Sequence, residues 1–162
     1  MGAVNIRILC VGKLKETYFT EACAEFQKRL GRFCTLSVTE VPDEKAPESL
    51  HPADEALVRE KEGKRLLKAI GEKDFVVALA IDGRMLTSEG FADFLEEKEM
   101  NGVRTLTFVI GGSLGLSPEV YARADARLSF SKMTFPHRIA RLLLLEQLFR
   151  AYKIRAHEAY HK

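Results

Sequence analysis

The feature of this sequence that most constrains its fold is an almost unbroken apolar run at residues 75–81 (FVVALAI). A strand that is apolar on both faces must be covered on both faces, as happens inside a parallel sheet. Other stretches show strand patterns, and segments with apolar residues at three- and four-residue spacing separate them. The predicted strands are residues 4–11, 35–41, 75–81, 104–110 and 126–130, and the predicted helices are residues 13–30, 54–70, 87–98, a short one from Pro118, and 135–156. This alternation predicts an α/β fold with a mainly parallel sheet and helices on both faces.

The composition is typical of one globular domain, which we expect to span residues 1–162. The chain has 46% hydrophobic and 30% charged residues, and no apolar stretch approaches the roughly 20 residues of a membrane span. We find no secretory signal pattern. Because Cys10, Cys23 and Cys34 show no disulfide or metal-ligand spacing, we expect a cytoplasmic protein with free thiols and no membrane or metal partner. The net charge of +2 neither requires nor excludes a nucleic-acid partner.

One predicted loop is unusually long. Residues 42–52 contain Pro42, Pro47 and Pro52 and few apolar side chains, so they predict an extended connection between a strand and a helix. A surface excursion is the favoured interpretation, and a mobile lid near a site is the alternative.

A glycine-rich loop is the first candidate ligand site. The predicted strand at residues 104–110 runs into residues 111–115 (GGSLG), and ligands of parallel α/β folds bind beyond the carboxyl ends of strands. The glycines alone are equally compatible with a ligand loop and with a tight turn. The dinucleotide fingerprint is absent, because the first strand is followed only by Gly12. A P-loop is excluded, because Gly63-Lys64 is followed by Arg65 rather than by Ser or Thr.

The second candidate is the segment at residues 128–137 (LSFSKMTFPH). Its hydroxyl groups and exposed backbone amides are suited to an adenine edge and a ribose, and Phe130, Met133 and Phe135 can form apolar walls. The alternative is that some of these large side chains are simply part of the core.

The last helix carries two further signals. Apolar residues cover almost every direction around it (Ile139, Leu142, Leu143, Leu144, Leu145, Leu148 and Phe149). A helix of this kind needs burial on more than one side, so we predict a symmetric homodimer. The chain from Arg138 onward is also rich in Arg and Lys, which favours contact with RNA phosphates. The alternative for the last of these cations is that they complement the helix dipole.

Residues 157–161 (HEAYH) match the pattern of zinc peptidases, in which two histidines on one helical face bind the metal and the glutamate is the base. Only Lys162 follows, and a chain end is a poor platform for a metal. A zinc hydrolase is therefore an alternative function that we consider weak. A second alternative is an RNA-binding factor without enzymatic activity that uses the basic chain end.

Five segments resemble one known family. They are residues 11–15 (VGKLK), 28–30 (KRL), 108–115 (FVIGGSLG), 128–137 (LSFSKMTFPH) and 158–162 (EAYHK). In this order they resemble the bacterial ribosomal large-subunit (23S rRNA) pseudouridine N3-methyltransferases, the smallest members of the SPOUT class. The resemblance implies a C-terminal trefoil knot, a homodimer, S-adenosylmethionine as the cofactor, and methylation of a pseudouridine in the rRNA of assembled ribosomes.

The resemblance also implies positions for the functional residues. The cofactor site would consist of Leu79, Gly111, Phe130, Ser131, Lys132, Met133, Thr134 and Phe135. Pseudouridine N3 must lose its proton to attack the methyl group, so we expect His137 or His161 to act as the base and Tyr160 to orient the base or the uracil edge. For His137 a structural role is equally favoured. We expect Arg150, and after it Arg138 and Arg141, to bind the RNA backbone.

Overall fold

The computed structural model describes residues 4–45 and 51–162 and confirms the predicted α/β fold. The strands are β1 (Asn5–Val11), β2 (Thr35–Val41), β3 (Phe75–Met85), β4 (Thr105–Ile110) and β5 (Ala126–Ser129). The helices are α1 (Thr17–Leu30), α2 (Pro52–Ala69), α3 (Ser88–Met100), α4 (Pro118–Arg123) and α5 (His137–Arg155). The strands form one sheet in the order β2-β1-β4-β3-β5, and every pair is parallel.

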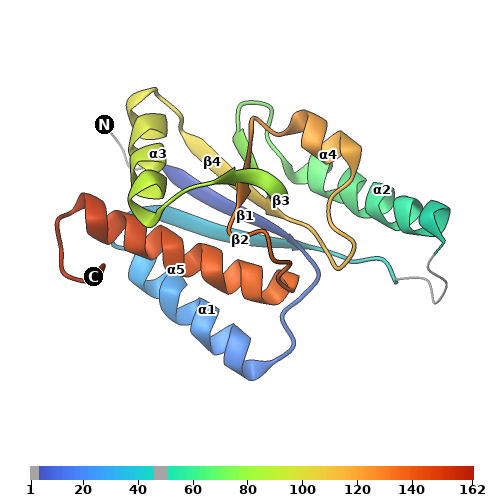
Figure 1. Cartoon of the computed structure of the whole chain (residues 1–162), viewed down its shortest axis with the longest axis horizontal. Helices are drawn as coiled ribbons and strands as arrows, with labels where there is room; N and C mark the ends of the chain where they lie inside the picture. The colour runs from blue at the N-terminus through green and yellow to red at the C-terminus, as the bar shows by residue number, and fades with distance from the viewer. Residues whose placement is uncertain (1–3, 46–50) are drawn as a thin grey trace.

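Helices cover both faces of the sheet, as the apolar run at residues 75–81 predicted (Figure 1). Successive side chains of a strand point to opposite faces. In β1, Ile6 and Ile8 therefore enter the core beneath α1, α3 and α5, whereas Leu9 enters the smaller core beneath α2 and α4. All three residues are fully buried.

The helix α5 is buried largely by its own chain. It lies against both α1 and α3, with the sheet beneath it (Figure 1). Leu144, Leu145 and Leu148 are fully buried there, and Leu142 and Leu143 are half-buried. A helix with apolar residues on several sides is thus accommodated within one subunit, so this pattern by itself does not require a partner subunit.

The main departure from the predicted elements is at the end of β3, which continues to Met85 rather than stopping at residue 81. Leu128 of β5 pairs first with Leu79 and again with Arg84, so residues 80–83 form an excursion around β5. Gly83 permits this close crossing, because a Cβ atom there would lie 2.7 Å from the backbone carbon of Leu128. The trefoil knot implied by the family resemblance stays a prediction.

Other boundaries differ by a few residues. The helix α1 begins at Thr17 rather than at residue 13, and α5 begins at His137 with Pro136 as its N-cap. The lid alternative for residues 42–52 depends on residues 46–50, which lie outside the described residues. No helix within the described ranges is both long and apolar enough to cross a bilayer.

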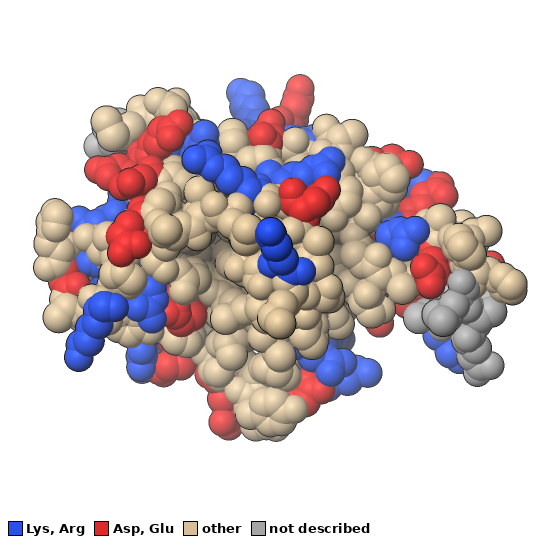
Figure 2. All heavy atoms as spheres, in the orientation of Figure 1, with Lys and Arg blue, Asp and Glu red and all other residues tan. Residues whose placement is uncertain are grey.

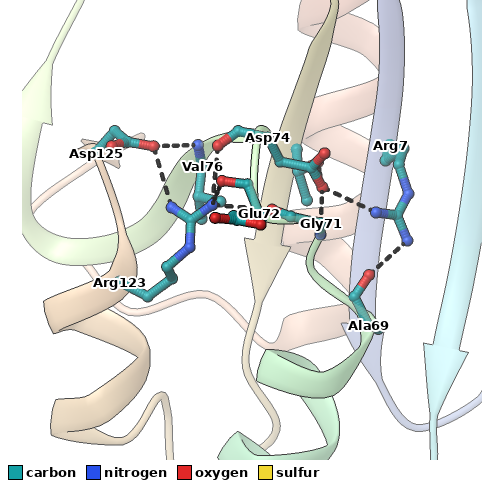
Figure 3. A network of polar contacts seen from close by, with 9 residues as sticks. Arg7, Ala69, Gly71, Glu72, Asp74, Val76, Arg123 and Asp125 are labelled. Carbon is teal, nitrogen blue, oxygen red and sulfur yellow. Dashed lines mark hydrogen bonds and ion pairs between the residues drawn. The ribbon is translucent and has the colours of Figure 1, made fainter.

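A polar network fixes the amino-terminal edge of the sheet (Figure 3). The Asp74 carboxylate accepts hydrogen bonds from Arg7 Nη1 at 2.9 Å, from the Gly71 backbone amide at 2.9 Å and from Thr107 Oγ1 at 3.0 Å. Arg123 at the end of α4 donates to the carbonyl oxygens of Gly71 and Asp74, both at 3.0 Å. This network ties the start of β3 to β1, β4 and α4, at the edge of the sheet opposite the carboxyl ends of the strands.

Candidate active site

A cavity of about 680 Å³ lies beside the middle of β3 and the carboxyl ends of β4 and β5. Three segments form most of its lining: Leu79, Ala80 and Ile81 of β3, residues 110–113 with Gly115 and Leu116 from the end of β4 onward, and residues 128–131 and 133–138 from the end of β5 onward. Tyr121 of α4 and Ala140 of α5 complete it. Its volume is within the range of small-molecule and cofactor sites. The two segments that the sequence indicated as ligand sites therefore meet in one cavity, at the edge where parallel α/β folds bind ligands.

The glycine loop forms one wall of this cavity, and its shape depends on Gly111. A Cβ atom at Gly111 would lie 2.7 Å from the carbonyl carbon of Gly115 and 2.8 Å from its oxygen. Gly115 has a φ of +85°, and its amide donates to the carbonyl of Gly112 at 3.1 Å. The loop is thus closed on itself, and no side chain fits at Gly111 without displacing it.

The opposite wall is the segment between β5 and α5. Ser129 Oγ donates to the Ser131 carbonyl at 2.9 Å, and Ser131 Oγ accepts from the Met133 amide at 3.0 Å. These local bonds fix the turn. Seven of the residues predicted to bind the cofactor line the cavity (Leu79, Gly111, Phe130, Ser131, Met133, Thr134 and Phe135). Lys132 is exposed and is not among the residues that line it.

His137 lines the same cavity, at the first turn of α5. Pro136, and not His137, occupies the N-cap position of α5. Burial lowers the pKa of His137, and the nearby Arg138 and Arg141 lower it further. The imidazole is therefore neutral near pH 7, and a neutral imidazole can accept a proton.

The chain end turns back along α5 after Arg155 (Figure 1). Tyr160 packs edge-on against Phe149, with ring centroids 4.9 Å apart, and the Arg150 guanidinium lies 4.8 Å from the centre of the Tyr160 ring. Glu158 binds Arg32 and Lys153, and these two cations lower the pKa of its carboxyl to about 2. The tail is thus an ordered part of the structure rather than a frayed terminus.

Both ring nitrogens of His161 are engaged in the tail. Nδ1 lies 3.1 Å from Arg150 Nη1, and Nε2 lies 2.7 Å from a carboxylate oxygen of Glu89. A guanidinium group can only donate, so Nδ1 must accept and Nε2 must donate to Glu89. In this arrangement His161 has no free lone pair. His137 is therefore the better-placed of the two predicted bases.

The tail does not have the geometry of a zinc site. The helix α5 ends at Arg155, and His157 has a φ of +55°, so residues 157–161 are not helical. Glu158, which would be the base of a zinc hydrolase, is held by Arg32 and Lys153. No group of three potential metal ligands occurs within residues 4–45 and 51–162. The geometry of the tail therefore does not support a zinc hydrolase.

The arginines predicted to bind RNA are mostly paired within the chain. Arg138 Nη1 lies 2.6 Å from Glu16, and Arg150 lies 2.7 Å from Glu146. Pairing of this kind leaves cations and anions interspersed over the face seen in Figure 2. Arg138 also lines the cavity. Both residues stay candidates for RNA binding, provided that phosphates can replace the carboxylates.

The prediction that Arg141 binds the RNA backbone does not agree with its position in the structure. It is only 4% exposed, and its guanidinium donates to Glu40 at 2.8 Å and to the carbonyl of Gly12 at 3.3 Å. The side chain therefore joins α5 to the ends of β1 and β2 and is not available to phosphate. The sequence could not show this, because the basic character of a residue does not reveal which side of its helix is covered.

We expect replacement of Arg141 by alanine to lower the free energy of unfolding by about 2–4 kcal/mol, because it leaves the Glu40 carboxylate and the Gly12 carbonyl without their donor. Urea denaturation measures this loss. The matched control is Arg29→Ala, which removes an exposed ion pair with Glu25 and should cost less than about 1 kcal/mol. Equal losses in the two variants would contradict the structural role of Arg141.

The site contains residues that the sequence did not single out. Ile81 and Tyr121 line the cavity, and Glu62 of α2 lies directly behind Gly112. One signal for Glu62 was present. It occupies the position between Val58 and Leu66 in a stripe of buried residues at four-residue spacing on α2, where an apolar side chain is expected.

An all-parallel sheet with a cavity at the carboxyl ends of its strands defines a ligand-binding α/β fold. The structure of "a probable methylase family protein" from Haemophilus influenzae shares this fold, with a TM-score of 0.56 and 18% sequence identity over 98% of this chain and 71% of that chain. The family model described as "Predicted SPOUT methyltransferase" matches residues 4–161. This chain belongs to the SPOUT methyltransferase family.

Relatives with higher identity match from end to end. A protein from Bifidobacterium animalis subsp. lactis is 55% identical to this chain over 159 residues. Proteins from Ligilactobacillus salivarius and Clostridioides difficile are 52% and 51% identical. Each alignment covers 98% of this chain and 100% of the relative, and each relative is named ribosomal RNA large subunit methyltransferase H.

Proposed function

We propose that this protein is an S-adenosylmethionine-dependent methyltransferase that modifies N3 of a pseudouridine in large-subunit rRNA in the cytoplasm. The observation that carries the proposal is the cavity formed by the glycine loop and residues 128–137, in a chain that is about half identical to named rRNA methyltransferases over its whole length. The position of the modified atom and the requirement for an assembled ribosome come from the family resemblance of the sequence.

The cavity has the properties that S-adenosylmethionine requires. Its volume of about 680 Å³ is sufficient for a nucleoside with an amino-acid side arm. Leu79, Phe130 and Phe135 offer apolar surface, Ser131 and Thr134 offer hydroxyl groups, and the glycine loop allows close approach to its backbone. The bound cofactor supplies an activated methyl group. The protein has to hold it, exclude water and present a deprotonated nucleophile.

We assign the removal of the N3 proton to His137. The imidazole lines the cavity and is neutral near pH 7, because burial and two neighbouring arginines lower its pKa. Proton transfer to a positioned base contributes a factor of about 10²–10⁴ to the rate of such reactions. Arg138, which follows it on α5 and also lines the cavity, is placed to contact the backbone of the substrate RNA.

Replacing His137 by glutamine is therefore expected to lower kcat by about 10²-fold or more without a comparable change in cofactor affinity. In the wild type the rate should fall as the pH decreases through the lowered pKa of His137, because the protonated imidazole cannot accept a proton. The variant should lack this dependence. Methyl transfer to rRNA measured across a pH series tests both points, and an unchanged kcat would exclude His137 as the base.

A homodimer would bring the tail to the cavity. Arg150 lies about 20 Å along α5 from His137, at 1.5 Å per residue, and none of the described tail residues lines the cavity of its own chain. Large apolar side chains near the cavity are exposed, including Ile81 at 52%, Met133 at 74% and Phe135 at 38%. We propose that a second copy covers this surface and places its Tyr160 beside the first copy's cavity. Sedimentation that shows only monomer at micromolar concentration would contradict the dimer.

The function is tested with large-subunit rRNA and assembled ribosomes from a strain that lacks the gene. Purified protein and S-adenosylmethionine should restore one methyl group on one pseudouridine, detected by mass spectrometry of nuclease fragments. A binding factor without enzymatic activity would associate with ribosomes, bind no S-adenosylmethionine in calorimetry and leave the mass of the rRNA unchanged.

A further inference from the structure

A buried carboxylate lies behind the glycine loop and has no part in the mechanism described above. Glu62 is 4% exposed, although it is an ionisable residue on a helix that otherwise presents charged side chains to water. The helix α2 approaches this region closely, because a Cβ atom at Gly63 would lie 2.3 Å from Ser117 Oγ. The close contact between α2 and the start of α4 places Glu62 against the loop that follows β4.

The contacts of Glu62 are incomplete. Its Oε2 accepts the backbone amide of Glu44 at 3.0 Å, while Oε1 is buried and has no hydrogen-bond partner among the described residues. The Cβ position of Gly112 lies 3.2 Å from Oε1 and 3.3 Å from Oε2. Arg65 is the nearby cation, but it donates to the Pro42 carbonyl and to the Glu44 carboxylate instead. No cation among residues 4–45 and 51–162 therefore forms a direct ion pair with Glu62.

Burying a carboxylate without a compensating positive charge costs free energy of folding. The buried position of Glu62 therefore suggests a function. Gly112 separates Glu62 from the cavity, because it has Glu62 on one side and lines the cavity on the other. A negative charge that is buried in protein, where the effective dielectric constant is low, acts on a ligand more strongly than the same charge in water. The ligand under the proposed function is S-adenosylmethionine, whose sulfonium is positive. The product left after methyl transfer, S-adenosylhomocysteine, is a neutral thioether at the same atom.

We propose that Glu62 is a specificity-determining residue: its carboxylate, one glycine away from the cavity, favours a ligand with a positive charge at the reacting centre over the neutral product. This inference rests on the proposed function. A unit charge about 10 Å away changes affinity by about tenfold at an effective dielectric constant of about 20, and solvent screening lowers this to about three- to tenfold. The preference assists turnover, because the spent cofactor is held less tightly than the fresh one.

The test is calorimetric titration of wild type and Glu62→Gln with three ligands. S-adenosylmethionine and sinefungin are both positive near the reacting position, the latter through an amine, and S-adenosylhomocysteine is neutral there. In Glu62→Gln the affinity for the two cationic ligands should fall by about three- to tenfold, with a change of less than about twofold for the neutral one. An equal change for all three ligands, or none, would overturn the inference.

Two further variants control for structure and net charge. Glu60→Gln removes the same charge from an exposed position on α2 and should leave all three affinities unchanged. Glu62→Asp keeps the charge and should keep the preference for cationic ligands, so loss of the preference in both Glu62 variants would indicate a packing role instead. Failure of the wild type to bind S-adenosylmethionine at all would reject the proposed function itself, an outcome distinct from a missing difference between ligands.

The pH provides an independent readout. Burial raises the pKa of Glu62, as do Asp43 and Glu44, while the Glu44 amide and Arg65 act in the opposite direction. In the wild type the ratio of the affinities for S-adenosylmethionine and S-adenosylhomocysteine should therefore rise with pH as Glu62 ionises. In Glu62→Gln, which retains Asp43, Glu44, Arg65 and the cavity-lining His137, the ratio should rise less. A ratio that varies equally in both proteins would overturn the assignment to Glu62.

Discussion

Replacing Gly111 by alanine is expected to weaken binding of S-adenosylmethionine by about 10- to 100-fold in a protein that still folds, because inserting a methyl group into a closely packed site costs about 1–3 kcal/mol. The added Cβ atom would lie 2.7 Å from the carbonyl carbon of Gly115 and 3.1 Å from a methyl carbon of Leu116. The backbone of Gly115 cannot swing aside as a flexible side chain would, so the loop has to open. Opening moves one wall of the cavity, and calorimetry of the purified variant measures the result.

The matched control for this variant is Gly31→Ala. Gly31 ends α1 with a φ of −57°, which any residue adopts. A Cβ atom there would meet the carbonyl oxygens of Lys28 at 3.3 Å and Gln27 at 4.0 Å, both in the same helix end. Its cofactor affinity should equal that of the wild type. If Gly111→Ala bound the cofactor as tightly as Gly31→Ala, the glycine loop would not be a wall of the cofactor site.

Deleting residues 160–162 is expected to reduce methyl transfer by at least about 100-fold while cofactor affinity stays within about twofold of the wild type, since loss of a positioning element affects the reacting geometry more than remote binding. The deletion removes the Tyr160 ring from Phe149 and the His161 imidazole from Arg150 and Glu89. No described tail residue lines the cavity of its own chain. Single-turnover methylation of rRNA, together with calorimetry, separates the two effects.

Removal of Lys162 alone is the control, because this exposed residue lies beyond all of those contacts. It should retain full activity. A shortened chain that lacks residues 160–162 and still methylates rRNA at the wild-type rate would reject any role of the tail in catalysis. A simultaneous loss of cofactor binding would place the tail at the cofactor instead of the RNA.

The extent to which the site could be predicted differs between its parts. Gly111, Phe130 and Phe135 were found because loops that follow parallel strands converge at one edge, which the chain order alone reveals. Lys132 was placed in the cavity on the family resemblance, but it is exposed and is not among the residues that line the cavity. Glu62 was missed because its importance depends on a neighbour 50 positions away in the chain, Gly112, which no local pattern reveals.

The sequence by itself determined the element order, the parallel sheet and the two layers of helices, because strand and helix periodicities are local properties and the run at residues 75–81 requires cover on both faces. The tertiary structure decided which basic side chains can contact a ligand or accept a proton. It buried Arg141 against Glu40 and placed His137 in the cavity, while it engaged both nitrogens of His161. The physical reason is that charge and proton affinity depend on burial and on partners brought together from distant parts of the chain, and a linear pattern specifies neither.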